Sequence, residues 1–150
     1  MKYYAAYGSN LNTKQMARRC PRAKPIGTAL LKGWKLSFKG SHSGFYLSID
    51  RKKGWSVPLG IWQIDDFDEK ALDRYEGYPN FYQKFMLPIN IHCFDGSKSL
   101  EQVLIYALPS TARYGLPTGS YVGTCVDGYE DFGFDLKYLE DAFNASRRNK

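Results

Sequence analysis

A short polar segment near the start of the chain has the residue types of a small anion site. Residues 3–11 read Tyr-Tyr-Ala-Ala-Tyr-Gly-Ser-Asn-Leu, an apolar run that Gly8 interrupts before a helical pattern over residues 12–19. A strand–loop–helix unit of this kind directs backbone N–H groups toward one point, where an anion is favoured. Gly8 permits close approach of the backbone or a positive φ, and Ser9 and Asn10 can cap the helix or donate hydrogen bonds. An ordinary turn explains the same segment about equally well.

A second residue with chemical potential, Glu76, is predicted to stand at the end of a helix. Asp66 fits the N-cap of that helix, Glu69 completes a capping box, and Gly77 is a typical terminating residue. The negative end of the helix macrodipole disfavours an ionised carboxylate at this position, where a basic residue is the usual choice. Helix stability alone therefore does not explain Glu76.

The sequence around Glu76 suggests that its pKa is raised. Tyr75, Tyr78 and Phe81 flank it, and an apolar environment disfavours the charged form of a carboxyl group. A general acid/base that works near neutral pH needs such a pKa. The competing interpretation is a solvated surface glutamate paired with a basic residue of the same helix, which is the commoner situation for this residue type.

Composition describes a folded protein with one core. The chain has 150 residues, of which 43% are hydrophobic and 24% charged, so we expect one domain over residues 1–150. Aromatic residues make up 16%, which favours a β-rich core or an amphipathic pocket lining. The net charge of +6 is scattered, with no basic run longer than residues 51–53, and this favours a solvated surface over a nucleic-acid footprint.

The cysteines and histidines indicate neither a metal site nor a disulfide framework. Cys20, Cys93 and Cys125 are far apart and odd in number, and His42 and His92 are isolated. This pattern fits a reducing cytoplasm. The chain also lacks the features of a signal peptide and any apolar run long enough to cross a membrane. We expect a cytoplasmic protein with no membrane partner, no metal and no cofactor.

Hydrophobic periodicity and turn residues predict strands over residues 2–7, 26–31, 34–38, 45–49, 57–64, 81–94 and 102–108. The predicted helices cover residues 12–19, 66–76 and 121–129, and a last one that Asp135 caps frays at residues 147–150. The predicted connections between strands are Gly33, a flexible polar loop at residues 40–44, a basic turn at 51–54, a hairpin turn at 95–97 and a long loop at 110–119. Mixed strands with few helices favour an α+β fold whose sheet closes into a small barrel with the helices outside.

Taken together, the two chemical segments resemble those of the γ-glutamylcyclotransferase family, also called AIG2-like. Its members carry a YGSNL-type loop after the first strand, as in residues 7–11, and a Glu-Gly pair at a helix end, as in residues 73–77. Residues 31–38 look like the family's second and third strands, and residues 59–64 look like its Gly-x-x-Trp strand. The similarity covers roughly residues 3–130.

The resemblance implies a small mixed β-barrel with flanking helices and a cavity between the first loop and Glu76. It implies that the α-amine of a γ-glutamyl group attacks its own γ-carbonyl, forming 5-oxoproline and releasing an amine or amino acid. Glu76 is the expected general acid/base. The expected partner is thus a small γ-glutamyl molecule and not a nucleic acid. The residues expected to bind it are Tyr7, Gly8, Ser9, Asn10, Leu11, Tyr82 and Tyr121.

Two features bear on the substrate, and two other functions stay open. The 40–44 segment is short where some relatives have long glycine-containing stretches, and residues 78–81 resemble an insert of members that act on γ-glutamylamines. Ser9 is disfavoured as a covalent nucleophile because neither histidine has a motif relation to it. The alternatives are a non-catalytic binding module for a carboxylate-bearing metabolite or a partner, and a basic nucleic-acid-associated domain. The leaving amine and the oligomeric state are left open.

Overall fold

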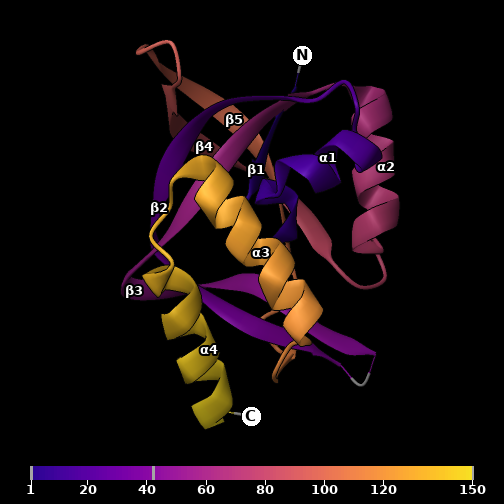
Figure 1. Ribbon diagram of the computed structural model, residues 1–150, viewed down its shortest axis with the longest axis vertical. Helices are drawn as coiled ribbons and strands as arrows, with labels where there is room; N and C mark the ends of the chain where they lie inside the picture. Colours follow the sequence, from indigo (N-terminus) through magenta and orange to yellow (C-terminus); the bar gives the residue numbers. More distant parts are fainter. Residues whose placement is uncertain (1, 42, 150) are drawn as a thin grey trace.

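A closed barrel of five strands forms the centre of the molecule (Figure 1). The structure is a computed structural model that describes residues 2–41 and 43–149. The barrel strands are β1 (Lys2–Ala6), β2 (Lys24–Ser41), β3 (Gly44–Ile64), β4 (Gln83–Cys93) and β5 (Lys98–Ala107), and a short sixth strand, β6 (Arg113–Tyr114), lies outside the ring. The helices are α1 (Thr13–Arg19), α2 (Asp66–Glu76), α3 (Gly119–Phe132) and α4 (Lys137–Asn149), with a 3-10 turn over Ser9–Leu11.

The strand order is β3-β1-β5-β4-β2, and the β2–β3 pairing closes the ring. β1 and β5 run parallel, the other neighbours run antiparallel, and β6 adds to the end of β2. Alternate side chains of the strands fill the core, which includes Phe38, Ile49, Leu59, Ile91 and Ile105. The predicted fold class, an α+β fold with a small mixed barrel and flanking helices, is confirmed.

The two longest strands, β2 and β3, run through segments that were predicted to interrupt them. Gly33 and Gly54 have φ of +84° and +88°, and the ladder passes irregularly from the pair Lys32–Ser56 to the pair Trp34–Arg51. The prediction of separate strands on either side of Gly33 and of residues 51–54 is therefore wrong. Positive φ at the two glycines accommodates a bulge, and pairing resumes beyond it.

Three other predicted boundaries also differ. The predicted 40–44 loop is a tight connection, because Ser41 already pairs with Gly44; His42 lies outside the described residues. The predicted long loop at 110–119 contains β6. The predicted frayed tail is helical through Asn149, and Ser146 accepts a hydrogen bond of 2.8 Å from the Phe38 N–H, which ties α4 to β2.

The N-cap of α2, the helix that carries Glu76, lies one residue earlier than predicted. Asp65, not Asp66, is the N-cap, and Asp68 completes the capping box through hydrogen bonds of 2.8 and 3.1 Å. Gly77 ends the helix with φ of 65°, as predicted. α2 thus starts directly after β3 and carries its last residue, Glu76, to the end of the barrel where the first loop lies.

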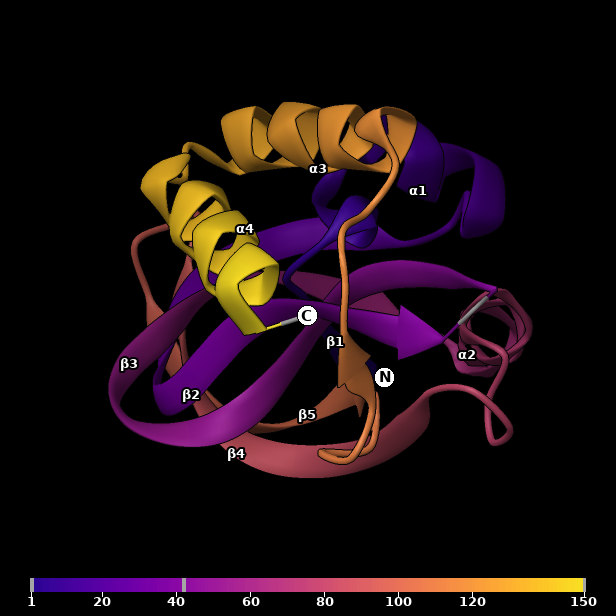
Figure 2. The ribbon, with the colours of Figure 1, turned by 90° about the horizontal axis from the view of Figure 1, so that it is seen from below.

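The helices α1, α3 and α4 lie over one side of the barrel, and β4 and β5 form the opposite side (Figure 2). Tyr129 of α3 donates a hydrogen bond of 2.9 Å to the carbonyl oxygen of Tyr7, which fixes α3 against the first loop.

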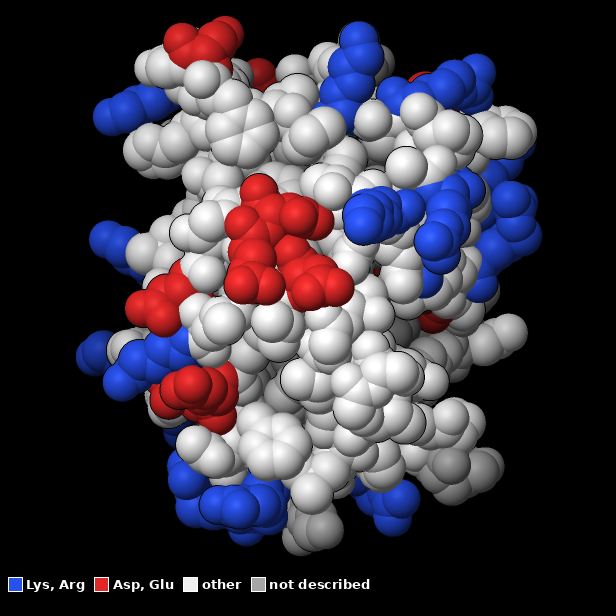
Figure 3. All heavy atoms as spheres, viewed as in Figure 1, with Lys and Arg blue, Asp and Glu red and all other residues white. Residues whose placement is uncertain are grey.

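Figure 3 shows acidic side chains gathered over α3 beside basic ones over α1 and α2. Within the described residues, no helix is long and apolar enough to cross a membrane.

Candidate active site

The loop after β1 leaves three backbone N–H groups unpaired. The Leu11 N–H donates to the Gly8 carbonyl and the Asn12 N–H to the Ser9 carbonyl, each at 3.0 Å, which forms the 3-10 turn. Within the part of the chain that the structure describes, no hydrogen bond uses the N–H of Gly8, Ser9 or Asn10. These groups are therefore free to bind a carboxylate or an oxyanion.

Gly8 matters in this loop because it lets the backbone lie close to neighbouring side chains, and not because it adopts a positive φ. Its φ is −130°, which other residues also adopt. A Cβ atom at this position would lie 3.2 Å from the Tyr121 hydroxyl oxygen and 3.4 Å from the Leu47 Cβ. The absence of a side chain thus keeps open the space between the loop and Tyr121.

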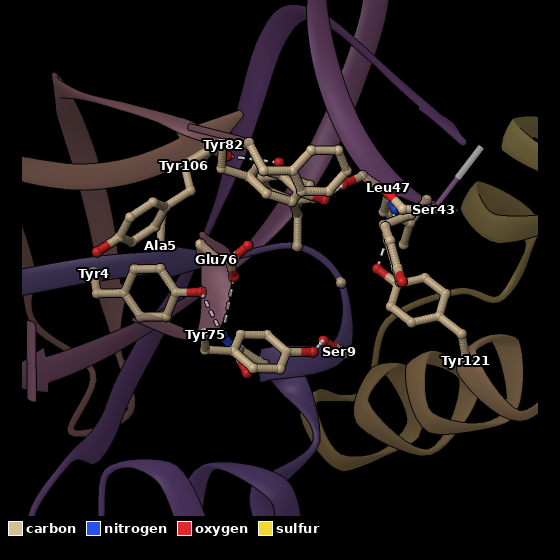
Figure 4. Close-up of a pocket in the computed structure, with 15 residues that line it drawn as sticks. Tyr4, Ala5, Ser9, Ser43, Leu47, Tyr75, Glu76, Tyr82, Tyr106 and Tyr121 are labelled. Carbon is tan, nitrogen blue, oxygen red and sulfur yellow. Dashed lines mark hydrogen bonds between the residues drawn. The ribbon is translucent and has the colours of Figure 1, made fainter. Parts of the chain in front are cut away.

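This space belongs to a cavity of about 350 Å³ that also contains the Glu76 side chain. Figure 4 shows Glu76 between Tyr4 and Tyr82, with Ser9 and Tyr75 on one side and Tyr121 across the cavity. The lining residues are Tyr4, Ala5, Tyr7, Gly8, Ser9, Asn10, Ser43, Tyr46, Leu47, Tyr75, Glu76, Phe81, Tyr82, Tyr106 and Tyr121.

The environment of Glu76 raises its pKa to about 7, because burial disfavours the charged carboxylate, and Arg19 opposes this shift. The Asn10 Nδ2 lies 3.5 Å from the Glu76 Oε1 and is the hydrogen-bond partner of this carboxylate within the described residues. The alternative of a solvated glutamate paired with a basic residue of its own helix does not describe this position. Of the aromatic residues that flank it in sequence, Tyr75 and Phe81 line the cavity, whereas Tyr78 does not.

The tyrosines of the cavity wall are held by hydrogen bonds to backbone groups. The Tyr7 hydroxyl donates to the Tyr106 carbonyl at 2.6 Å, and the Tyr82 hydroxyl donates to the Leu47 carbonyl at 2.7 Å. The Leu47 N–H donates to the Tyr121 hydroxyl at 3.1 Å. Burial raises the pKa of Tyr7, Tyr82 and Tyr121 well above that of a free phenol, so these hydroxyls stay neutral. The wall is thus uncharged and fixed in shape.

The structure brings seven of the eight predicted site residues to this one cavity: Tyr7, Gly8, Ser9, Asn10, Glu76, Tyr82 and Tyr121. Leu11 is the exception, because it is fully buried and does not line the cavity. Its side chain lies against Gly60 and Gly128, where an added Cβ would come within 2.4 and 2.8 Å of Leu11 atoms. Leu11 therefore seats the loop on the barrel and on α3.

Sequence reasoning missed Arg19, Tyr4, Tyr46 and Tyr106 as parts of the site. The Arg19 guanidinium stacks on the Tyr75 ring, and its Nη1 donates to the Asn10 Oδ1 at 2.5 Å. Tyr4 and Tyr106 stack edge to face at 5.9 Å. Tyr4 lies in a strand that the sequence predicts, and the alternation of side chains along that strand could have indicated which face it occupies. Nothing in the local sequence distinguishes Arg19 from an ordinary basic residue at a helix end.

Metal ligands do not gather in the described residues, where no group of three or more His, Cys, Asp or Glu side chains is arranged to hold an ion. Cys20, Cys93 and Cys125 are free thiols. Burial raises the pKa of Cys20 to about 11 and that of Cys125 to about 12. Both thiols are therefore protonated and unreactive at neutral pH.

Three solved structures share much of this fold. One is described as a gamma-glutamyl cyclotransferase, with a TM-score of 0.79 and 23% identity over 94% of this chain and 85% of that one. An uncharacterized Homo sapiens protein gives the same TM-score and coverage at 24% identity. An AIG2-like protein from Mus musculus has a TM-score of 0.56 and 18% identity, covering 81% of this chain and 82% of its own. At these identities the likeness concerns the fold.

No curated protein matches the sequence. The family model described as "Gamma-glutamyl cyclotransferase, AIG2-like" matches residues 4–123, which include both the loop after β1 and Glu76. Because this match spans most of the chain, the protein belongs to the gamma-glutamyl cyclotransferase, AIG2-like family.

Proposed function

We propose that this protein is a γ-glutamyl cyclotransferase that releases 5-oxoproline and a free amine or amino acid from a γ-glutamyl conjugate. The observation that carries the proposal is the position of Glu76, a carboxyl group with a pKa of about 7 in a cavity that also exposes the Gly8–Asn10 loop. A carboxyl group titrating near neutral pH can accept and return a proton in one reaction cycle.

The proposed reaction begins with the substrate's α-ammonium group near Glu76. The carboxylate takes a proton from it, and the resulting amine attacks the γ-carbonyl carbon of the same molecule. A new C–N bond closes the five-membered ring, and the bond to the leaving amine breaks as Glu76 returns its proton to that amine's nitrogen. The ring nitrogen still carries one proton more than the product, and Glu76 takes this second proton and passes it to the released amine, so that 5-oxoproline and an ammonium ion leave. The atoms balance without water or a second substrate, and every step uses groups of this chain.

The unpaired N–H groups of Gly8, Ser9 and Asn10 support two roles in this scheme. They fit either the substrate's α-carboxylate or the negative charge that develops on the γ-carbonyl oxygen, and both are anions within a small cavity. Donors that are already oriented cost no reorganisation when charge develops.

The fixed wall of Tyr7, Tyr82 and Tyr121 supports a role in positioning. Ring closure needs the flexible γ-glutamyl chain to be folded so that its amine meets its carbonyl, and confinement supplies that geometry. The cavity of about 350 Å³ is at the lower end of the range for small-molecule sites, roughly 300–1,000 Å³, which suits a small conjugate.

We further propose that residues 1–150 act as one domain in the cytoplasm. The free thiols of Cys20, Cys93 and Cys125 suit a reducing compartment.

The deciding experiment measures 5-oxoproline formation from γ-glutamyl-alanine, γ-glutamyl-ε-lysine, a γ-glutamyl polyamine and glutathione. The variant Glu76→Gln removes the proton-transfer group with little change in size, and Glu140→Gln is the matched control because Glu140 is exposed on α4. We expect turnover of at least one conjugate by the wild type and by the control, and loss of turnover in Glu76→Gln with substrate binding retained.

Failure of the wild type to turn over any of the conjugates, from folded protein, would contradict the proposal. If calorimetry then showed that the wild type and Glu76→Gln bind γ-glutamyl compounds equally well, the protein would be a binding module on this scaffold.

A further inference from the structure

The Arg19 side chain has contacts that the proposed reaction does not explain. Arg19 is the last residue of α1, where a basic residue usually points into solvent and interacts with the helix dipole. Its guanidinium carbon instead lies 3.2 Å from the centre of the Tyr75 ring, and its Nη1 lies 2.5 Å from the Asn10 Oδ1. Both partners line the cavity. The guanidinium therefore reaches the back of the site from outside its lining.

These contacts determine which way the Asn10 amide faces. A guanidinium group only donates hydrogen bonds, so the amide oxygen must face Arg19 and the amide nitrogen must face the other way. That nitrogen lies 3.0 Å from the Tyr4 hydroxyl oxygen and 3.5 Å from the Glu76 Oε1. The amide thus uses its oxygen on Arg19 and its two N–H groups on Tyr4 and Glu76.

The backbone at Asn10 is held separately. The Trp62 Nε1 donates a hydrogen bond of 3.0 Å to the Asn10 carbonyl oxygen. With the backbone fixed by Trp62, the remaining freedom of Asn10 is the rotation of its side chain, and Arg19 is the group that restrains the oxygen end. The Tyr75 ring under Arg19 is in turn tied to the loop, because its hydroxyl lies 3.0 Å from the Ser9 Oγ.

We propose that Arg19 is a positioning residue, which orients the Asn10 amide so that its N–H group holds the Glu76 carboxylate for proton transfer in the cavity. The proposal rests on the proposed function and assigns a role to a residue that does not line the cavity.

The charge of Arg19 adds a second effect on the same carboxylate. Within the described residues, the ionisable groups that interact electrostatically with Glu76 are Arg19 and the tyrosines Tyr4, Tyr7, Tyr75, Tyr82 and Tyr121. The tyrosines stay protonated, so Arg19 is the charged group that favours ionised Glu76. Its removal should raise the pKa of Glu76, because burial then acts alone.

The test compares Arg19→Met, Arg19→Lys, Asn10→Ala and the double variant Arg19→Met/Asn10→Ala, with Arg18→Met as the control. Arg18 is the exposed neighbour of Arg19 on α1. Two readouts are needed: the pH titration of the Glu76 side-chain carboxyl carbon by NMR, which does not depend on activity, and the pH profiles of kcat and KM.

We expect Arg19→Met to raise the pKa of Glu76 and to lower kcat by roughly 10- to 100-fold with a smaller change in KM, as for a displaced catalytic group. Arg19→Lys should keep the pKa close to that of the wild type but restore only part of kcat, since lysine retains the charge without the planar fork. In the Asn10→Ala background, adding Arg19→Met should cost less than about 3-fold in kcat, because residues that act through one another are not additive. Arg18→Met should change neither readout.

Full additivity of Arg19→Met and Asn10→Ala would overturn the proposal, as would an unchanged kcat and an unchanged Glu76 titration in folded Arg19→Met. If Arg19→Met does not fold, Arg19→Lys and its combination with Asn10→Ala make the same comparison. Failure of the proposed function looks different: the wild type would then turn over no conjugate, while the Glu76 titration would still report whether Arg19 acts on this carboxylate.

Discussion

The Asn10 amide nitrogen lies 3.5 Å from the Glu76 Oε1, although 66 positions separate the two residues in the chain. The barrel brings them together. β1 leads into the loop that carries Asn10, and it pairs antiparallel with β3, whose end leads directly into α2. A shift of β1 along β3 by one residue would turn its side chains to the opposite face and move this contact apart. The site geometry is therefore set by the register of two neighbouring strands.

The first prediction concerns the pH dependence of turnover. In the proposed reaction Glu76 acts as a base in its ionised form, and its pKa is about 7, so kcat/KM should rise with pH through about 7. The measurement is kcat/KM for the best conjugate from pH 3.5 to pH 9. A rise centred near 4.5, the ordinary value for glutamate, would show that the carboxyl group is solvated and would contradict the burial described here.

The second prediction concerns stability, and its sign follows from the same shift. The folded protein holds the Glu76 proton up to a pH of about 7, whereas the unfolded chain releases it near 4.5, so ionisation disfavours the folded state between these values. The stabilisation from protonated Glu76 is complete below pH 4.5 and is lost as the pH rises through 7. Relative to Glu76→Gln, the wild type should lose on the order of 2–3 kcal/mol between pH 4.5 and 8.

Urea unfolding of both proteins at several pH values measures this difference, since the contributions of all other groups cancel between the two. A constant difference across the range would mean that Glu76 has the same pKa in the folded and unfolded states.

Local sequence patterns predicted the elements that carry the site but not the long hairpin behind it. The strand before Gly8, the helix that ends at Glu76 and the Gly77 terminator depend on short-range signals and were confirmed. Gly33 and Gly54 gave equally clear local signals for strand breaks, yet β2 and β3 continue past them. A glycine that ends a strand and one that forms a bulge look alike locally, because the difference lies in the pairing of the partner strand.

The same limit explains the misplaced cap and the missed arginine. Two pairs of residues have the spacing of a capping box, Asp65 with Asp68 and Asp66 with Glu69. The structure uses the pair Asp65–Asp68, because β3 ends directly before Asp65. Arg19 carries a basic charge at the end of a helix, which needs no further explanation in sequence terms. Its contacts with Asn10 and Tyr75 exist only because α1 and α2 meet at the cavity.

The third prediction concerns Gly8→Ala. The φ of Gly8, −130°, lies outside the left-handed region that favours glycine, so we expect the variant to fold. Its Cβ would nevertheless lie 3.2 Å from the Tyr121 hydroxyl oxygen, which is a tight contact inside the cavity. We expect kcat/KM to fall by roughly 10-fold or more, as for a displaced substrate. Gly119→Ala is the control, because its added Cβ meets no atom within 4 Å. Unchanged kcat/KM in Gly8→Ala would show that substrate does not use the space beside Tyr121.

The fourth prediction tests whether α3 holds the first loop. A Cβ at Gly128 would lie 2.6 Å from the Asn12 backbone nitrogen and 2.8 Å from the Leu11 carbonyl carbon, so Gly128→Ala must push the helix and the loop apart. Overpacking of this kind costs about 1–3 kcal/mol, and the displaced loop should also reduce turnover.

The control is Gly123, which lies on the same helix, is exposed and has no atom within 4 Å of an added Cβ. Gly123→Ala should therefore stabilise the protein by about 0.5–1 kcal/mol through helix propensity alone. Urea unfolding and 5-oxoproline assays of the two variants separate the effects. Equal stability of Gly128→Ala and Gly123→Ala would mean that α3 does not press on the loop, and that the loop keeps its shape through Trp62 and Arg19 instead.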